Sequence, residues 1–119
     1  MQKLGFAYWH GNGVKLDKKK AVKYYRMAAD RGDAYAQFIS GCCFRDGFGV
    51  TQDDAEAFRF SKPAADQGLT EAEHNLGCMY ADGRGVARDD AEAIRWLMRA
   101  GAKGCRRSND LVAELRRRT

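Results

Sequence analysis

The sequence predicts an all-α protein built as an α-solenoid, in which antiparallel helix pairs are stacked in the order of the chain. A seven-residue phrase recurs as GNGVKLD at 11–17, GFGVTQD at 47–53 and GRGVARD at 83–89, and each copy begins 36 residues after the last. Flanking small residues keep the same register, at Gly5, Gly41, Gly77, Ala21, Ala57, Ala93, Gly32, Gly68 and Gly104. A fixed period of this size is typical of stacked helical repeats. One repeat cannot bury its own apolar face, so we expect neighbouring repeats to pack against one another.

The third copy, residues 69–104, shows the first helix of the repeat most clearly. One apolar stripe at helical spacing is formed by Ala72, Leu76, Met79 and Tyr80. Gly83 and Gly85 follow this stripe, and glycine allows the positive φ that a tight turn requires. We name this first helix helix A.

A second helix, helix B, is predicted to begin at Asp89. Asp89 and Glu92 match a reciprocal capping box, in which each side chain bonds the backbone N–H of the other residue. The buried stripe of helix B is formed by Ala93, Trp96, Leu97 and Ala100, and Gly104 ends the helix. Each repeat is therefore predicted to consist of helix A, a turn, helix B and a second turn.

The second copy, residues 33–68, follows the same plan. Its helix A stripe is formed by Ala36, Ile39, Cys43 and Phe44, and its helix B begins at Asp53 and buries Ala57, Phe60 and Ala64. The small residues shared by the two copies are expected to let helices A and B approach closely; they are Gly41, Gly77, Ala57 and Ala93.

Pro63 lies within helix B of the second copy. A proline inside a helix removes one backbone donor and clashes with the carbonyl four residues earlier, at a cost of roughly 3 kcal/mol. We therefore expect helix B to kink or to end early between Arg59 and Pro63.

We expect one repeat domain over residues 1–119. Its parts are repeat 1 (1–32, lacking the first turn of helix A), repeat 2 (33–68), repeat 3 (69–104) and a C-terminal capping helix (105–119). The apolar flank of the first helix has no preceding repeat to cover it, so either a longer array or a homodimer through this helix is expected to cover it. The capping helix has one apolar stripe, at Leu111, Val112 and Leu115, as the end of an array requires.

The bulk composition favours a cytoplasmic globular protein. Hydrophobic residues make up 45% of the chain, and no apolar run is long enough to span a membrane. The N-terminus has no signal-peptide pattern. Cys42 and Cys78 occupy equivalent positions on equivalent helices of adjacent repeats. The axes of packed helices lie about 8–10 Å apart, which exceeds the roughly 7 Å limit for a disulfide between α-carbons. We expect four free thiols and a reducing compartment.

With these residues laid out, the chain resembles the Sel1-like repeat family, relatives of the tetratricopeptide repeats. The segments that carry the resemblance are LGFAYWHGNGVKLDKKKAVKYYRMAADRG, the stretch 41–68 and NLGCMYADGRGVARDDAEAIRWLMRAGAKG. The departures are Ser40 where the family prefers leucine, Pro63, and Gly101 where alanine is usual. The resemblance implies right-handed superhelical stacking, with helix A lining the concave face, and a non-enzymatic role as a scaffold or adaptor for other proteins.

By analogy with tetratricopeptide grooves, the resemblance also implies a partner-binding groove on helix A. Its predicted residues are Phe6, Trp9, His10, Tyr35, Phe38, Cys42, Arg45, Glu71, His74, Cys78, Asp82 and Arg107, and Gln2 and Asp110 are also expected at concave positions. Aromatic and arginine side chains most often anchor interfaces. The expected anchors are Phe6, Trp9, Tyr35, Phe38 and Arg45.

Other chemistries have weaker support in the sequence. His74 and Cys78 are four residues apart on one helical face, and Cys42 points into the same groove, but a metal site with these three ligands lacks a fourth. The glycine phrases lack the Gly-Lys-Ser/Thr ending of a phosphate loop. No catalytic set is indicated, since the chain has only two histidines. We expect no enzymatic activity and no cofactor.

Charge suggests an alternative function. The net charge is +5, with basic clusters near both ends, around Lys15 to Lys23 and Arg116 to Arg118, and a mildly acidic middle. Such ends could bind a nucleic acid or another acidic surface by electrostatic attraction. A nucleic-acid footprint normally forms one continuous basic stripe, so the interaction scaffold is the first hypothesis.

Overall fold

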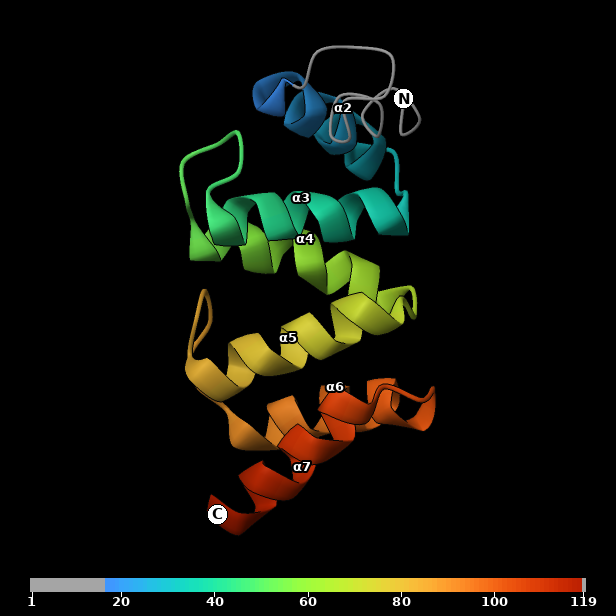
Figure 1. Ribbon diagram of the computed structural model, residues 1–119, viewed down its shortest axis with the longest axis vertical. Coiled ribbons are helices and arrows are strands. Elements are labelled where there is room, and N and C mark those ends of the chain that lie inside the picture. The colour runs from blue at the N-terminus through green and yellow to red at the C-terminus, as the bar shows by residue number, and fades with distance from the viewer. Residues whose placement is uncertain (1–16, 119) are drawn as a thin grey trace.

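The computed structural model describes residues 17–118, and all regular structure in this range is helical (Figure 1). The helices are α2 (Lys18–Asp30), α3 (Ala34–Asp46), α4 (Asp54–Asp66), α5 (Thr70–Asp82), α6 (Asp90–Ala102) and α7 (Arg106–Arg118). The expectation of an all-α repeat fold is confirmed. Helix A of the first repeat, with its expected uncovered flank and homodimer contact, lies outside the described residues. Among the described helices, none could span a membrane.

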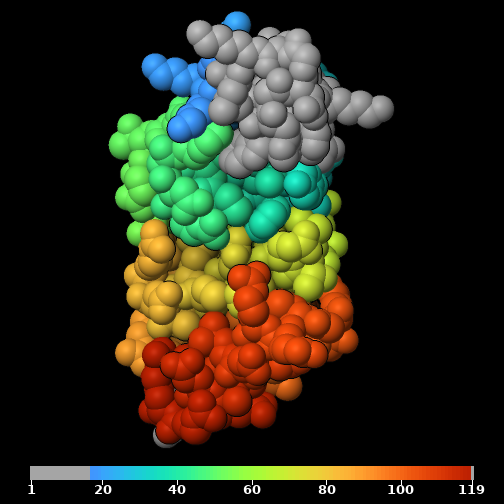
Figure 2. Space-filling view, in the orientation of Figure 1, coloured from blue at the N-terminus to red at the C-terminus, as the bar shows by residue number. Residues whose placement is uncertain are grey.

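The helices form an elongated stack rather than a closed bundle. Each helix packs mainly against the helices that precede and follow it in the chain, and the molecule measures 48 × 27 × 22 Å. Successive segments form consecutive bands along the long axis in Figures 1 and 2. Helices α3 and α5 are the A helices of the second and third repeats, α2, α4 and α6 are B helices, and α7 follows as the next A helix.

The core is divided into three clusters along the stack. The first cluster joins helices α2 to α5 around Tyr25, Phe44 and Phe60. The rings of Phe44 and Phe60 are stacked, with their centroids 5.7 Å apart. The second is centred on Leu76 and Trp96, and the third joins α5, α6 and α7 through Leu97 and Leu115. Each cluster spans consecutive helices, so burial of apolar surface holds each repeat to its neighbours.

Close approach of helices A and B depends on the two small helical glycines. A β-carbon on Gly41 would stand 2.6 Å from Ser61 Oγ and 3.1 Å from the Ala57 carbonyl oxygen. A β-carbon on Gly77 would stand 2.5 Å from Leu97 Cγ and 3.1 Å from the Ala93 carbonyl oxygen. The predicted close packing is confirmed, because a β-carbon at either crossing would force the facing side chain to shift.

The turn between helices A and B packs on the preceding repeat. Gly85 has φ +74°, and a β-carbon on it would overlap the Asp54 carbonyl oxygen at the start of α4. Gly49 makes the equivalent approach to the Lys18 carbonyl at the start of α2, where a β-carbon would stand 2.5 Å from that oxygen. The residue before each glycine adds a contact to the same helix start. Arg84 binds Asp54 at 2.9 Å, and the Phe48 ring lies 5.1 Å from Lys18 Nζ.

A second contact also recurs at equivalent positions with different chemistry. Gln67 Nε2 donates to Gln37 Oε1 at 2.8 Å in the second repeat. In the third repeat, 36 residues later, Lys103 Nζ binds Glu73 Oε1 at 2.9 Å and donates to the Gly68 carbonyl at 2.6 Å. An amide pair and an ion pair therefore join the end of helix B to the start of helix A in successive repeats.

The helix starts confirm half of the predicted capping box. Asp53 and Asp89 are the N-caps of α4 and α6, and their carboxylates accept from the backbone N–H of Glu56 and Glu92. The reciprocal bond was predicted wrongly for Asp89, because its backbone N–H donates to the Tyr80 carbonyl at 2.9 Å. Glu92 pairs instead with Arg95 at 3.2 Å. The backbone N–H of Asp89 thus bonds the last part of helix A and fixes the turn between the two helices.

Pro63 does not end helix B early. Helix α4 continues to Asp66 and has the same length, 13 residues, as the other helices. The Pro63 carbonyl accepts from the Gln67 N–H at 3.1 Å, so regular bonding resumes after the proline. The alternative, a kink, stays a prediction.

Ser40 places a hydroxyl group in the core. Its side chain is fully buried, and its hydroxyl has no hydrogen-bond partner among residues 17–118. The equivalent position in the third repeat is Leu76, which is also fully buried. Ser40 therefore buries a hydroxyl where the repeat otherwise places an apolar side chain.

We predict that Gly85→Ala destabilises the protein by about 2 kcal/mol or more, because alanine is strained at this φ and its β-carbon overlaps the Asp54 carbonyl. Gly83→Ala is the control, since Gly83 has a similar φ of +66° but faces only its own turn, at Arg88. Chemical unfolding measures both. Equal losses for the two variants would contradict a role of Gly85 in inter-repeat packing.

We predict that Ser40→Ala raises the free energy of unfolding by about 1 kcal/mol, because it removes a buried hydroxyl that has no partner in the described part of the chain. Ser108→Ala is the matched comparison. Ser108 is equally buried, but its hydroxyl contacts His74 at 2.7 Å, so this variant is expected to lose stability. A loss of stability in Ser40→Ala would show that its hydroxyl is satisfied in solution.

Candidate functional site

The A helices α3, α5 and α7 present one connected surface. Asn75 Nδ2 of α5 donates to Cys42 Sγ of α3 at 3.7 Å, and His74 Nδ1 of α5 lies 2.7 Å from Ser108 Oγ of α7. We call this surface the helix A face. The predicted positions that these three helices carry are Tyr35, Phe38, Cys42, Arg45, Glu71, His74, Cys78, Asp82 and Arg107. Phe6, Trp9 and His10 lie outside the described residues.

The predicted residues differ in how far they are exposed. Tyr35 is 40% exposed, and its ring centroid lies 6.2 Å from that of the half-buried Phe38, which packs against the second core cluster. Glu71, Asp82 and Arg107 are exposed, and Cys42, Arg45 and Cys78 are half-buried. His74 is buried, at 8% exposure. The A helices therefore offer an aromatic pair on α3 and exposed charged side chains on α5 and α7.

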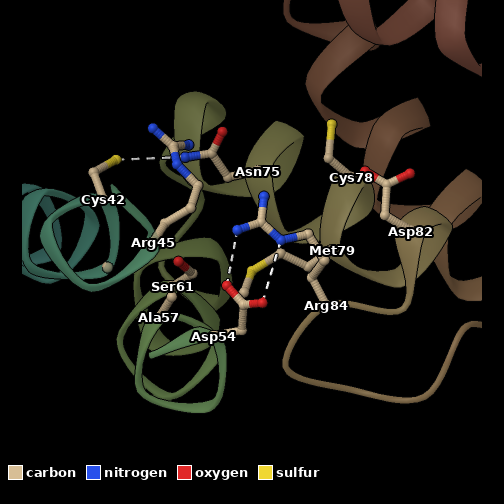
Figure 3. A pocket seen from close by; sticks show the side chains of 11 residues that line it. Cys42, Arg45, Asp54, Ala57, Ser61, Asn75, Cys78, Met79, Asp82 and Arg84 are labelled. Atoms are coloured by element: carbon tan, nitrogen blue, oxygen red, sulfur yellow. Dashed lines mark hydrogen bonds and ion pairs between the residues drawn. The ribbon is translucent and has the colours of Figure 1, made fainter. Parts of the chain in front are cut away.

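A small cavity lies on this face where α3, α4 and α5 meet (Figure 3). Its volume is about 50 Å³, and four predicted residues line it: Cys42, Arg45, Cys78 and Asp82. The other lining residues were not predicted; they are Gly41, Asp54, Ala57, Ser61, Asn75, Met79 and Arg84. The lining residues that come from α4 and from the turn could not be predicted from the residue spacing of helix A alone. The contact of that turn with the preceding repeat brings Arg84 into the cavity.

Two guanidinium groups are fixed beside the cavity. Arg84 binds Asp54 at 2.9 Å, and the dashed lines in Figure 3 show this pair. Arg45 binds its neighbour Asp46 at 3.0 Å, and this hydrogen bond raises the pKa of Arg45 and lowers that of Asp46. Burial raises the pKa of Cys42 and of Cys78, so both thiols stay protonated at neutral pH. The cavity thus combines neutral thiols and a carboxamide with guanidinium donors.

The residues considered for a metal site do not form one. Within residues 17–118, no group of three or more His, Cys, Asp and Glu side chains is placed to hold a metal ion. Cys42 contacts Asn75, whereas His74 Nε2 contacts Cys78 Sγ at 3.5 Å. All four cysteines are free thiols, as predicted.

Sequence reasoning missed the contacts of Cys105. Its Sγ lies 3.1 Å from Ser108 Oγ and 3.9 Å from His74 Nδ1. These contacts join the start of α7 to the middle of α5, 31 residues earlier in the chain. The spacing of Cys105 and Ser108 along one helix turn was visible in the sequence, but the approach of His74 depends on how α7 packs.

The comparisons with known proteins agree with the repeat period. The model of the Sel1 repeat family matches residues 1–33, 34–69 and 70–105. No curated protein matches the chain.

Several solved structures are similar. A Sel1 repeat protein from Oxalobacter formigenes is 31% identical, with a TM-score of 0.90 over 93% of this chain and 46% of that one. A protective antigen of uropathogenic Escherichia coli with an SLR fold is 36% identical, with a TM-score of 0.88 over 90% of this chain and 23% of that one. Cysteine rich protein B of Helicobacter pylori shares the fold at 19% identity, with a TM-score of 0.74 over 80% of this chain and 71% of that one. The chain thus spans about half the length of the Oxalobacter formigenes protein and about a quarter of the length of the Escherichia coli antigen.

Proposed function

The chain belongs to the Sel1 repeat family, and we propose that it is a non-enzymatic scaffold that binds a peptide or protein surface on its helix A face. Proteins of this family are generally protein-interaction scaffolds. The family membership supports the general role, and the particular surface is our inference from the geometry of α3 and α5.

The observation that carries the proposal is the cavity between α3, α4 and α5. Two successive repeats build it, and its lining combines apolar groups, such as Met79, with the guanidinium groups of Arg45 and Arg84. A recess of about 50 Å³ suits part of one side chain rather than a whole small molecule, because ligand pockets usually measure about 300–1,000 Å³. The exposed ring of Tyr35, on the same helix as Cys42 and Arg45, offers a second anchor.

The two arginines beside the cavity are ion-paired, which disfavours a nucleic acid at the cavity. Eight ion pairs join basic and acidic side chains within residues 17–118, and they involve Arg45, Arg59, Lys62, Arg84, Arg88, Arg95, Lys103 and Arg118. A phosphate backbone at the cavity would have to compete with Asp46 and Asp54 for Arg45 and Arg84, whereas Arg118 is the member of these pairs that comes from the basic ends. The electrostatic binder, acting through its basic ends, is kept as the alternative outcome of the test. The four free thiols support the proposal of a cytoplasmic location.

We predict that Tyr35→Ala and Arg45→Ala each weaken peptide binding by about tenfold, which corresponds to about 1.4 kcal/mol. The probe is a peptide selected from a random-peptide phage library on the purified chain, and fluorescence anisotropy measures its Kd. The control is Met98→Ala, because Met98 is also an exposed large apolar residue, at 48%, but lies on α6 away from the cavity. Thermal unfolding is expected to change little in Tyr35→Ala.

Three results would count against this proposal. Selected peptides that bind both variants as tightly as the original chain would exclude the α3 surface. Unfolding of Tyr35→Ala would place this residue in the core. Tight binding to generic duplex DNA or RNA that falls steeply with salt, in the absence of any selected peptide, would favour the electrostatic alternative.

A further inference from the structure

Helix α2 carries more positive charge than the other B helices. Its 13 residues contain five basic side chains and one acidic side chain, for a net charge of +4. Helix α4 contains two basic and three acidic side chains, for a net charge of −1, and helix α6 contains two of each. The first turns of α4 and α6 hold two acidic residues each, whereas that of α2 holds none. Because a helix dipole disfavours cations at its N-terminus, the lysines that begin α2 do not stabilise the helix.

The acidic partners that pair with cations on the other B helices are replaced in α2. In α4, Arg59 binds Glu56 at 3.0 Å, and the equivalent pair in α6 is joined at 3.2 Å. The equivalent positions in α2 are occupied by Lys23 and Lys20, so a second cation stands where the repeat otherwise places a carboxylate. Two like charges therefore lie three residues apart on α2, where the other B helices have an ion pair.

Lys19 and Lys23 are exposed, and neither makes an ion pair within residues 17–118. The preceding segment, residues 1–16, contains no Asp or Glu that could supply one. The positive charge on this side of α2 is therefore available to a partner of opposite charge.

A groove runs beside these cations, between α2 and the turn that follows α3. It consists of two open hollows of about 270 and 370 Å³, which share Lys19 and Val50. Lys23 and Arg26 line its α2 wall, and the other wall is formed by the turn 47–51. In Figure 2 the start of α2, in blue, lies against this turn, in green. We call this hollow the α2 groove.

The chemistry of the two walls favours a protein segment over a nucleic acid. The α2 wall is cationic, and its one acidic residue, Asp30, is the last residue of the helix. The residues that line the groove from the turn are uncharged and include the half-buried Val50. No aromatic residue lines either hollow, so an unpaired base would find no ring on which to stack. A cationic wall opposite an apolar one suits a peptide that has both acidic and apolar side chains.

The spacing of the lysines defines the pattern of such a peptide. Lys19 and Lys23 are four residues apart on a helix, which corresponds to about 6 Å along its axis. Alternate side chains on one side of an extended peptide are about 6.6 Å apart. Two carboxylates separated by one residue therefore match the two lysines, and the residue between them points to the opposite side, as the turn wall requires.

We propose that the α2 groove binds an extended acidic segment of a protein partner, in which Asp or Glu residues alternate with apolar residues. Its carboxylates pair with Lys19 and Lys23, and the apolar side chains between them contact Val50. The α2 groove shares no lining residue with the cavity between α3, α4 and α5, so this second site does not depend on the function proposed above.

The test measures the binding of fluorescein-labelled Glu-Leu-Glu-Leu-Glu to the purified chain by fluorescence anisotropy at low ionic strength. We expect Gln-Leu-Gln-Leu-Gln to bind about tenfold more weakly, because it has no charge to pair with the lysines. Glu-Ser-Glu-Ser-Glu keeps the charge and loses the apolar contacts, so it should bind severalfold more weakly. Added salt should weaken the binding of the acidic peptide, because the pairs are exposed.

Variants of the chain locate the site. The double variant Lys19→Gln with Lys23→Gln is expected to weaken binding about fivefold, because it removes two exposed ion pairs. The control is Arg95→Gln with Arg117→Gln, which changes the net charge equally at exposed positions outside the groove; Arg95 occupies on α6 the position equivalent to Lys23. This control and Tyr35→Ala, on the helix A face, should leave the affinity unchanged.

Four results would overturn the proposal. The acidic peptide fails to bind, or binds no better than its glutamine counterpart. The lysine variant binds as tightly as the original chain, or the arginine control is weakened as much, which would indicate general attraction to net charge. Tyr35→Ala removes the binding, which would place the peptide on the helix A face. Generic duplex DNA or RNA displaces the peptide at lower concentration than the unlabelled peptide itself, which would assign the groove to a nucleic acid.

Discussion

At two kinds of position in this molecule, the backbone of one element lies so close to another that a β-carbon there would displace a neighbouring group. Gly41 and Gly77 bring helix A against helix B within a repeat, and Gly49 and Gly85 bring each turn against the start of the preceding helix B. The first contact sets the spacing of the hairpin and the second sets the spacing between hairpins. Because both recur at the 36-residue period, the same arrangement is repeated along the chain, and apolar side chains fill the remaining space as three separate clusters.

The helix A face and its cavity follow from this stacking. The turn that packs on α4 carries Arg84 to Asp54, and this pair lies beside the cavity that α3 and α5 share. The side chains at equivalent contact positions differ, since an arginine–aspartate pair replaces a lysine–phenylalanine contact and a lysine–glutamate pair replaces two glutamines. The close backbone contacts at the glycines therefore determine how the repeats stack. The side chains around them differ from repeat to repeat, so the charge and the chemistry of each surface also differ.

Much of the architecture could be predicted from local patterns. The stripes at helical spacing identified buried residues such as Leu76 and Leu97, and the aspartates before each helix B were recognised as N-caps. The early helix end considered at Pro63 and the reciprocal capping bond predicted at Asp89 were both wrong, for one reason. Both predictions considered a helix in isolation, whereas the packed hairpin keeps α4 helical past Pro63 and directs the Asp89 N–H to Tyr80.

The sequence by itself determined the helical repeat, its period and the faces that are buried, because these depend on residue type at fixed spacing within one or two helices. The tertiary structure alone decided which side chains of different helices meet. Asn75 reaches Cys42, and His74 joins Cys78 to Ser108 and Cys105, because the offset between successive A helices places them together. That offset arises from the summed packing of whole helices, and no local pattern in the chain encodes it.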